Sequence, residues 1–233
     1  MGLLNSSLDV RNVLYLYLAV AFPLMMTVFH FRSLLKTRGD YRAFLLYFMA
    51  FFTAFLALPL AIIFAVAPGP LEFLRFVGLT PGHVGTGLLF AAVGFPVALA
   101  AGFIGSRDPA MQAQYPFSKE ACAGIKKFVR FETAYFFLYY LPWEFVFRGI
   151  LFFPLVPMVG LIPALAVQTI ISTLYHFGHP PSEIFASLGA GVIFGMIAYA
   201  TGSIFYAVII HAAVGISNDV FLYVRRPRPG RSA

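Results

Sequence analysis

Residues 43–67 read AFLLYFMAFFTAFLALPLAIIFAVA and contain no charged side chain. A helix needs roughly 20 consecutive apolar residues to cross about 30 Å of hydrocarbon. This stretch is long enough to do so, and the turn-forming sequence Pro68-Gly69-Pro70 directly after it indicates where the helix ends. The stretch therefore predicts a membrane-spanning helix, and the rest of the chain repeats its pattern.

The composition extends this prediction to the whole chain. Of the 233 residues, 61% are hydrophobic and 11% are charged, and the mean hydropathy is +0.86. These values lie well outside those of a soluble globular domain, so we expect a single membrane domain over residues 1–233. The sole cysteine, Cys122, excludes an intramolecular disulfide framework and a thiolate zinc cluster.

Apolar runs separated by polar connectors predict an all-α, polytopic transmembrane helix bundle of about seven spans. A short helix lying in the membrane interface is predicted around Glu72 and Arg75. Pro154 and Pro157 are expected to end the fourth span, and Ser182 is expected to cap the sixth. The expected spans cover approximately residues 12–31, 43–67, 83–105, 131–153, 161–176, 182–200 and 203–224.

Three basic clusters predict the orientation of these spans. They lie at residues 32–42, 107–130 and 225–231, beside apolar runs. Cytoplasmic connectors are enriched in Lys and Arg, so seven spans place the N-terminus outside and the C-terminus in the cytoplasm. This distribution assigns the net charge of +7 to membrane topology, and we expect no nucleic-acid partner. The N-terminus lacks a basic n-region, so the first apolar run should remain as a helix.

Ionisable residues deep inside predicted spans occur only in the C-terminal half, and residues 1–105 are therefore expected to act as scaffold. A charge at membrane depth costs several kcal/mol unless it is paired or wetted. Each such residue is for this reason a candidate for function. The candidates are Glu144, Arg148, His176, His179, Glu183, His211 and Asp219.

The spacing of these residues suggests partners. Glu144 and Arg148 are four residues apart, so a helix presents both on one face as an ion pair, which is either functional or only self-neutralising. His176 lies further inside the fifth span and is the better candidate for function. His179, at the helix end, fits a partner of the helix dipole. Glu183, in a first helical turn, is favoured there by the dipole as well.

His211 lies about 12 Å inside the last span by helical rise. Asn218, seven residues later, returns to within about 20° of the same helix face, whereas Asp219 is rotated about 80° away. Asn218 is therefore better aligned with His211, and Asp219 is better suited to hold a charge.

These residues resemble the motifs of the CAAX prenyl protease and bacteriocin-processing (CPBP/Abi) family of intramembrane glutamic endopeptidases. The family's Glu-Glu-x-x-x-Arg motif is similar to residues 143–148, its Phe-x-x-x-His motif is similar to residues 172–176, and its last histidine corresponds to His211. The resemblance covers residues 115–219 and implies a catalytic core at residues 115–224.

Three departures indicate a divergent branch of the family. Trp143 stands in place of the first glutamate, Ser172 in place of the phenylalanine, and Gly215 in place of the Asn or Asp one turn after the last histidine. Residues 175–179 offer an alternative second motif that ends on His179. In such a branch, Glu183 and Asp219 would compensate for the lost groups.

The resemblance implies an endopeptidase of the prokaryotic cytoplasmic (inner) membrane that cleaves a membrane-anchored or C-terminally tagged protein. A glutamate and a histidine would activate water, and a second histidine with an amide or acid would stabilise the oxyanion. Arg148 would orient Glu144. The implied site contains Glu144, Arg148, His176, His211, Asn218 and Asp219, with Glu183 and His179 as support.

Other interpretations stay open. A catalytically inactive family member acting in immunity or partner binding agrees with Trp143. A small-solute transporter explains buried charges but not the ordered motifs. We expect no cofactor; a zinc site of Glu144, His176 and His211 is the alternative, disfavoured because the chain lacks the HExxH spacing.

Overall fold

The computed structural model describes residues 9–29, 35 and 39–226. All regular elements within these residues are helices, which confirms the predicted all-α fold. The predictions for the basic residues at positions 32, 36, 38, 228 and 231 lie outside the described residues.

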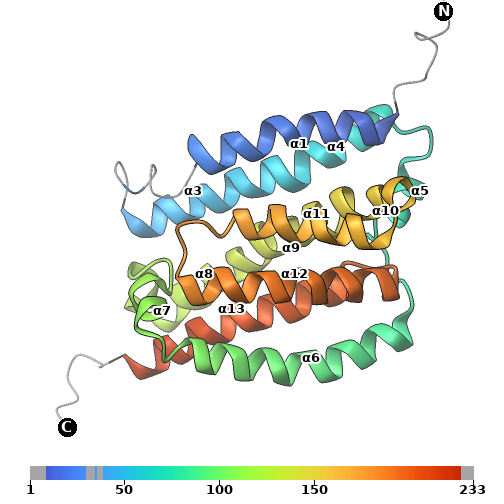
Figure 1. Ribbon diagram of the computed structural model, residues 1–233. Coiled ribbons are helices and arrows are strands. Elements are labelled where there is room, and N and C mark those ends of the chain that lie inside the picture. Colours follow the sequence, from blue (N-terminus) through green and yellow to red (C-terminus); the bar gives the residue numbers. More distant parts are fainter. Residues whose placement is uncertain (1–8, 30–34, 36–38, 227–233) are drawn as a thin grey trace, which may run out of the picture.

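The helices are joined by short connectors (Figure 1), and some are interrupted by wide π-helical stretches. The α-helices are α1 (Val10–Thr27), α3 (Asp40–Phe52), α4 (Leu58–Val66), α5 (Pro70–Phe76), α6 (Val84–Gly105), α7 (Pro109–Gln114), α8 (Ile125–Tyr135), α9 (Leu141–Glu144), α10 (Phe153–Val159), α11 (Leu161–Leu174), α12 (Pro181–Thr201) and α13 (Phe205–Arg225). The π-helical stretches are η1 (Thr53–Ala57), η3 (Phe136–Tyr140) and η4 (Phe145–Phe152), and η2 (Glu120–Ala123) is a 3-10 turn.

Six helical segments in the described part of the chain are long and apolar enough to cross a bilayer. α11, with 14 residues, extends only about 21 Å at 1.5 Å per residue, and it is the short fifth segment that the sequence predicts. The chain is thus a polytopic helical membrane protein. The six long segments are Val10–Thr27, Asp40–Val66, Val84–Gly105, Ile125–Val159, Pro181–Thr201 and Phe205–Arg225.

The fourth span differs from its prediction at both ends. It begins at Ile125 and continues through Pro154 and Pro157 to Val159. Pro154 lies in the first turn of α10, directly after η4, where the missing N–H is tolerated. The helix ends instead at Gly160, whose φ of 89° is readily adopted only by glycine.

The predicted cap at Ser182 is also wrong. α12 begins at Pro181, with Pro180 at the cap position and no side-chain cap. Proline suits the first helical position because its φ is preset and no N–H is left unsatisfied there. The Ser182 hydroxyl instead donates to Asp108 Oδ2 at 2.5 Å. This hydrogen bond lowers the pKa of Asp108 and ties the start of α12 to the connector after α6.

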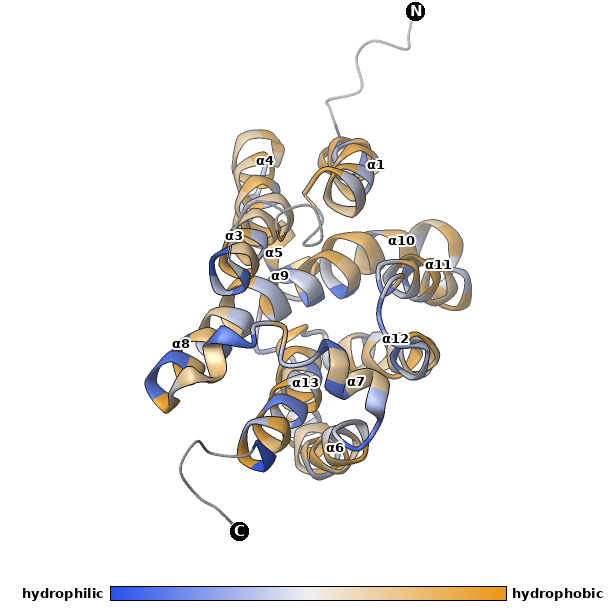
Figure 2. Cartoon of the chain, turned by 90° about the vertical axis from the view of Figure 1, so that its left-hand side faces the viewer, coloured by the Kyte–Doolittle hydropathy of each residue, from blue (hydrophilic) through white to orange (hydrophobic). Residues whose placement is uncertain are grey.

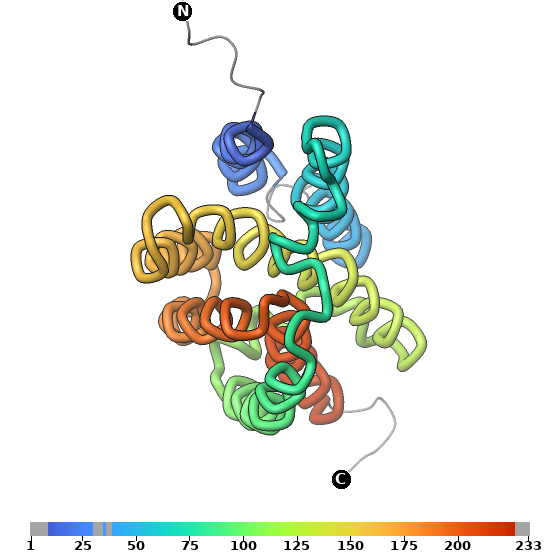
Figure 3. The backbone as a smooth tube through the Cα atoms, turned by 90° about the vertical axis from the view of Figure 1, so that its right-hand side faces the viewer, coloured from blue at the N-terminus to red at the C-terminus, as the bar shows by residue number. Residues whose placement is uncertain are grey.

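The long segment from α8 to α10 passes through the middle of the bundle, as Figures 2 and 3 show. α1 and the α3–η1–α4 segment lie on one side of it, and α6, α12 and α13 lie on the other. α13 packs along α6, and α11 packs along α12. Outward faces carry exposed apolar side chains such as Leu16, Ile162 and Phe185, as expected where lipid is the solvent.

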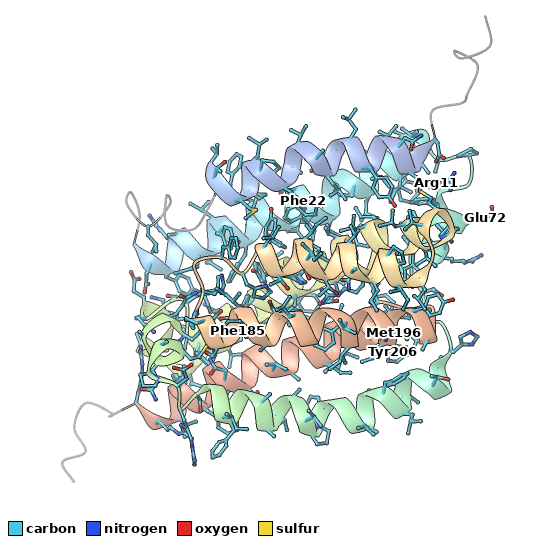
Figure 4. All side chains as sticks on the ribbon, viewed as in Figure 1. Arg11, Phe22, Glu72, Phe185, Met196 and Tyr206 are labelled. Atoms are coloured by element: carbon cyan, nitrogen blue, oxygen red, sulfur yellow. The ribbon has the colours of Figure 1, made fainter. Side chains whose placement is uncertain are left out.

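The described basic residues of the three clusters lie at one end of the bundle. Arg42 is near the start of α3, Arg107 follows α6, and Arg225 ends α13, and these three points lie together on the left of Figure 1. Arg11 and Glu72 lie at the opposite end (Figure 4). This clustering agrees with the positive-inside pattern; the assignment of that end to the cytoplasm stays a prediction.

An aromatic cluster joins the N-terminal spans to the central segment. Phe51 of α3 stacks on Trp143 of α9 with 5.9 Å between ring centroids, and it contacts Tyr139 at 4.4 Å. Phe55 and Tyr175 continue the cluster toward α11. Each aromatic pair adds about 0.5–1.5 kcal/mol beyond burial, so these contacts hold α9 in a fixed position.

Candidate functional site

A cavity of about 140 Å³ lies inside the bundle, between α6, α12, α13 and the central segment. Ala101 and Gly102 of α6 line it, so a span in the predicted scaffold also forms part of its wall. The polar residues in the lining are His176, His179, Glu183, Ser187, His211 and Asn218, together with Tyr115, Tyr135, Tyr139 and Tyr140.

Glu144 lies behind this cavity, at the centre of a buried charge network. It is fully buried and is not among the lining residues. Its Oε1 lies 2.6 Å from His211 Nδ1 and 3.3 Å from Arg148 Nη1, and its Oε2 lies 3.3 Å from Arg148 Nε. The structure therefore forms the ion pair that the four-residue spacing predicts, and it adds a contact to His211.

Local helix geometry positions this network. α9 gives way to the π-helical η4 immediately after Glu144, and Arg148 lies on the first wide turn. The guanidinium carbon of Arg148 lies 5.6 Å from the ring centre of Phe194 on α12. Wide π-turns of this kind are frequent at functional sites, and here one carries the arginine that contacts both Glu144 and the α12 wall.

His176 lies in the turn after α11 and presents a defined tautomer. Its Nδ1 is 2.8 Å from the carbonyl oxygen of Ser172. A carbonyl oxygen only accepts, so Nδ1 carries the proton and Nε2 of the neutral ring keeps its lone pair. Since His176 lines the cavity, it is suited to act as a base there.

Glu183 forms a second polar group in the same cavity. His179 Nδ1 lies 3.0 Å from Glu183 Oε1, and the Tyr115 hydroxyl donates to Glu183 at 2.8 Å. Burial raises the pKa of Tyr115 well above its ordinary value, which keeps this hydroxyl a donor. Glu183 lies in the first turn of α12, as predicted, but its side chain faces the cavity residues rather than only the helix end.

Asn218 and Asp219 are separated by the direction of their side chains. Both are buried, and Asn218 Nδ2 donates to Asp219 Oδ1 at 3.1 Å. Asn218 lines the cavity together with His211, as their angular alignment suggests, whereas Asp219 is not in the lining. Asp219 therefore contacts the cavity-lining Asn218 without lining the cavity itself.

Tyr140 fills the space beside Gly215. A Cβ atom at Gly215 would lie 1.7 Å from the Tyr140 hydroxyl oxygen. The Tyr140 ring meets His211 edge-on at 4.9 Å between ring centroids, and its centroid lies 4.5 Å from that of the Tyr135 ring. The motif position that lacks a side chain is thus occupied by a hydroxyl from η3.

Trp143 lies between the two cavity histidines. It is 1% exposed, and its ring centroid is 5.0 Å from that of His176 and 6.0 Å from that of His211. An indole ring has no acidic or basic group to contribute to proton transfer. Glu183 is therefore the carboxylate in the cavity lining that is available for catalysis.

Sequence reasoning missed three buried polar groups. Tyr115 falls in the polar connector, and Tyr140 falls in an aromatic run that is typical of helix packing. Glu132 is the second residue of the predicted fourth span, too close to its start to count as deep; in the structure the helix begins at Ile125, and Glu132 is 6% exposed. Only Glu132 carries a sequence signal, as a single carboxylate within the apolar run after Arg130.

Within residues 9–29, 35 and 39–226, no group of three or more His, Cys, Asp or Glu side chains is arranged to hold a metal ion. The alternative of a zinc site formed by Glu144, His176 and His211 therefore gains no support from this geometry.

Residues 128–217 match the model of the Rce1-like family, described as type II CAAX prenyl endopeptidase Rce1-like. No curated protein and no solved structure matches the chain. The matched stretch contains Glu144, Arg148, His176 and His211, and it ends one residue before Asn218. The resemblance seen in the motifs is thus confirmed over this part of the chain.

Proposed function

We propose that this CAAX-protease-like membrane protein is an intramembrane endopeptidase, acting in a prokaryotic cytoplasmic membrane on a membrane-anchored or C-terminally tagged protein. The observation that supports this best is the convergence of His176, His211 and Glu183 on one cavity inside an apolar bundle. Paired titratable groups in an enclosed cavity are typical of proton-transfer sites.

In this proposal His176 is the general base. Its Nε2 takes a proton from water as the water oxygen attacks the peptide carbonyl carbon, and the same proton passes to the amide nitrogen when the C–N bond breaks. Glu183 supplies the carboxylate that Trp143 does not, by orienting the attacking water in the cavity. Glu183 and His179 thereby have roles in a chain whose first motif glutamate is absent.

His211, Tyr140 and Asn218 act on the carbonyl oxygen. With Nδ1 facing Glu144, His211 has Nε2 available to donate to the developing oxyanion when that nitrogen is protonated. The Tyr140 hydroxyl is the second donor, in the space that a motif side chain at Gly215 would occupy. Donors fixed in place before the reaction stabilise an oxyanion strongly in a dry site.

Glu144 and Arg148 are positioning residues in this scheme. Glu144 fixes the ring of His211 through the 2.6 Å contact, and Arg148 neutralises the carboxylate through contacts to both of its oxygens. Asp219 orients the Asn218 amide in the same way.

The proposal is tested by mapping protein termini in membranes of cells that contain either the wild-type protein or the His176→Ala variant. Isolated membranes are incubated in H₂¹⁸O, so that only carboxyl groups formed by hydrolysis after protein synthesis has stopped take up a labelled water oxygen. We expect ¹⁸O-labelled C-termini that are present with wild type and at least a hundredfold reduced with His176→Ala.

The variant Tyr17→Phe is a matched control. The Tyr17 hydroxyl that it removes donates to the Ala54 carbonyl, and neither residue lines the cavity. Identical sets of termini in wild type and His176→Ala, at equal membrane abundance, would contradict the proposal. That result would favour the inactive, partner-binding interpretation.

A further inference from the structure

Glu132 is a buried carboxylate without a partner. Its side chain is 6% exposed, and neither carboxylate oxygen has a hydrogen-bond partner among the described residues. It lies on α8, seven residues after the first residue of the helix, and so about 10 Å along the axis at 1.5 Å per residue. An unpaired charge at membrane depth is costly, and such residues are generally matched by another group.

A second cavity, of about 340 Å³, is in contact with Glu132 and is separate from the histidine cavity. Val129, Phe137 and Val220, which line it, are exposed on the outer surface of the bundle. The cavity therefore opens toward lipid. Its full lining is Phe128, Val129, Glu132, Thr133, Phe136, Phe137, Ile216 and Val220.

A second buried acid acts on Glu132. Asp219, on α13, interacts electrostatically with Glu132, and its Oδ2 is also buried without a hydrogen bond among the described residues. Asp219 is not part of the outer cavity lining. Glu132 is thus the one carboxylate in the lining of this cavity, and a cation that enters the cavity would pair with it.

We propose that this cavity, between α8, η3 and α13, binds the Lys or Arg side chain of a membrane-spanning helix of a partner protein. The proposal concerns a surface outside the histidine cavity and holds whether or not the protein is a peptidase. The cation pairs with Glu132, its aliphatic stem lies against the apolar walls, and the partner helix covers the exposed rim.

The lining decides between a basic side chain and a metal ion. Hard cations such as Ca²⁺ need six to eight oxygen ligands, but the cavity offers only the carboxylate of Glu132 and the hydroxyl of Thr133. That hydroxyl already donates to the Val129 carbonyl. The aliphatic stem of a Lys or Arg side chain, in contrast, is stabilised by apolar and aromatic walls, and its charged end group needs only one carboxylate as a partner.

The lining also disfavours a lipid amine. A lipid headgroup brings a phosphate beside its amine, so its site would need a basic residue near Glu132. Lys126 and Arg130, on the same helix, are six and two residues away from Glu132. A helix rotates about 100° per residue, so both side chains point far from the Glu132 face. Neither residue lines the cavity.

The test uses a synthetic leucine–alanine transmembrane peptide with one lysine about 10 Å from its end, and an identical peptide with glutamine in that position. Energy transfer between labelled protein and labelled peptide is measured in phosphatidylcholine vesicles. We expect the lysine peptide to bind wild-type protein at least tenfold more tightly than the glutamine peptide. The Glu132→Gln variant should lose this preference.

Glu72→Gln serves as the matched control, because Glu72 is an exposed carboxylate on α5; it should keep the full preference. If Glu132→Gln does not fold, Val220→Trp blocks the mouth instead and should also remove the preference. Equal binding of the two peptides to wild type, or a preference that persists in both variants, overturns the proposal. Loss of the preference on adding phosphatidylethanolamine would assign the cavity to a lipid amine and would also overturn it.

Discussion

Glu144 and Glu132 lie twelve residues apart on one helical segment, Ile125–Val159, and both are buried, but their surroundings differ. Glu144 contacts Arg148 and His211. Glu132 has no hydrogen-bond partner among the described residues. The comparison separates two kinds of buried charge. One is neutralised within the chain and supports the histidine cavity, and the other lines a cavity that opens on the outer surface of the bundle, where a second molecule can supply the cation.

The largest expected effect follows from removing Glu144. Glu144→Leu leaves the Arg148 guanidinium buried and unpaired, so we expect a loss of about 3–5 kcal/mol in the free energy of unfolding. Chemical unfolding in detergent micelles measures it. The double variant with Arg148→Leu removes both charges and should regain most of this loss. A double variant no more stable than the single one would show that the pair is not what stabilises this region.

The next effect concerns the site that Glu144 supports. Tyr140→Phe keeps the ring that packs on His211 and removes only the hydroxyl, so the rate of hydrolysis of a substrate found by terminus mapping should fall about a hundredfold. The fall should appear in kcat, with little change in thermal stability. A rise in KM without a fall in kcat, or no change in either constant, would exclude the hydroxyl as an oxyanion donor.

A smaller effect tests the packing at the same place. Gly215→Ala puts a methyl group 1.7 Å from the Tyr140 hydroxyl oxygen, and the required shift should cost about 1–3 kcal/mol of unfolding free energy. The same substitution in a Tyr140→Ala background should cost much less, because the obstructing ring is gone. Unfolding of the four proteins of this cycle measures the coupling. Equal losses in both backgrounds would show that Tyr140 is not the constraint on position 215.

How far the sequence predicts this molecule depends on the type of signal. The fold is predictable because long uncharged runs have few alternatives in a membrane. The Glu144–Arg148 pair is predictable because helical periodicity alone brings residues four apart together.

Contacts between helices are not predictable in this way. The 2.6 Å contact of Glu144 with His211 joins residues 67 positions apart, and Tyr115 reaches Glu183 from a connector that carries no periodic signal. The start of the fourth span was misplaced because Lys126, Lys127 and Arg130 look like a connector. In the structure the helix already begins before them, and Glu132 therefore lies about two turns inside the helix rather than at its start.

The smallest effect distinguishes the two glutamates most directly, because it has the opposite sign. Glu132→Leu replaces a buried carboxyl that lacks a partner with an apolar side chain, and in vesicles without a basic peptide it should stabilise the protein by about 1 kcal/mol. The same substitution at Glu144 destabilises it. Unfolding of both variants under identical conditions checks the sign. If Glu132→Leu were destabilising to the same extent as Glu144→Leu, Glu132 would have to be paired within the chain, and the lipid-facing cavity would have no charge to offer a partner helix.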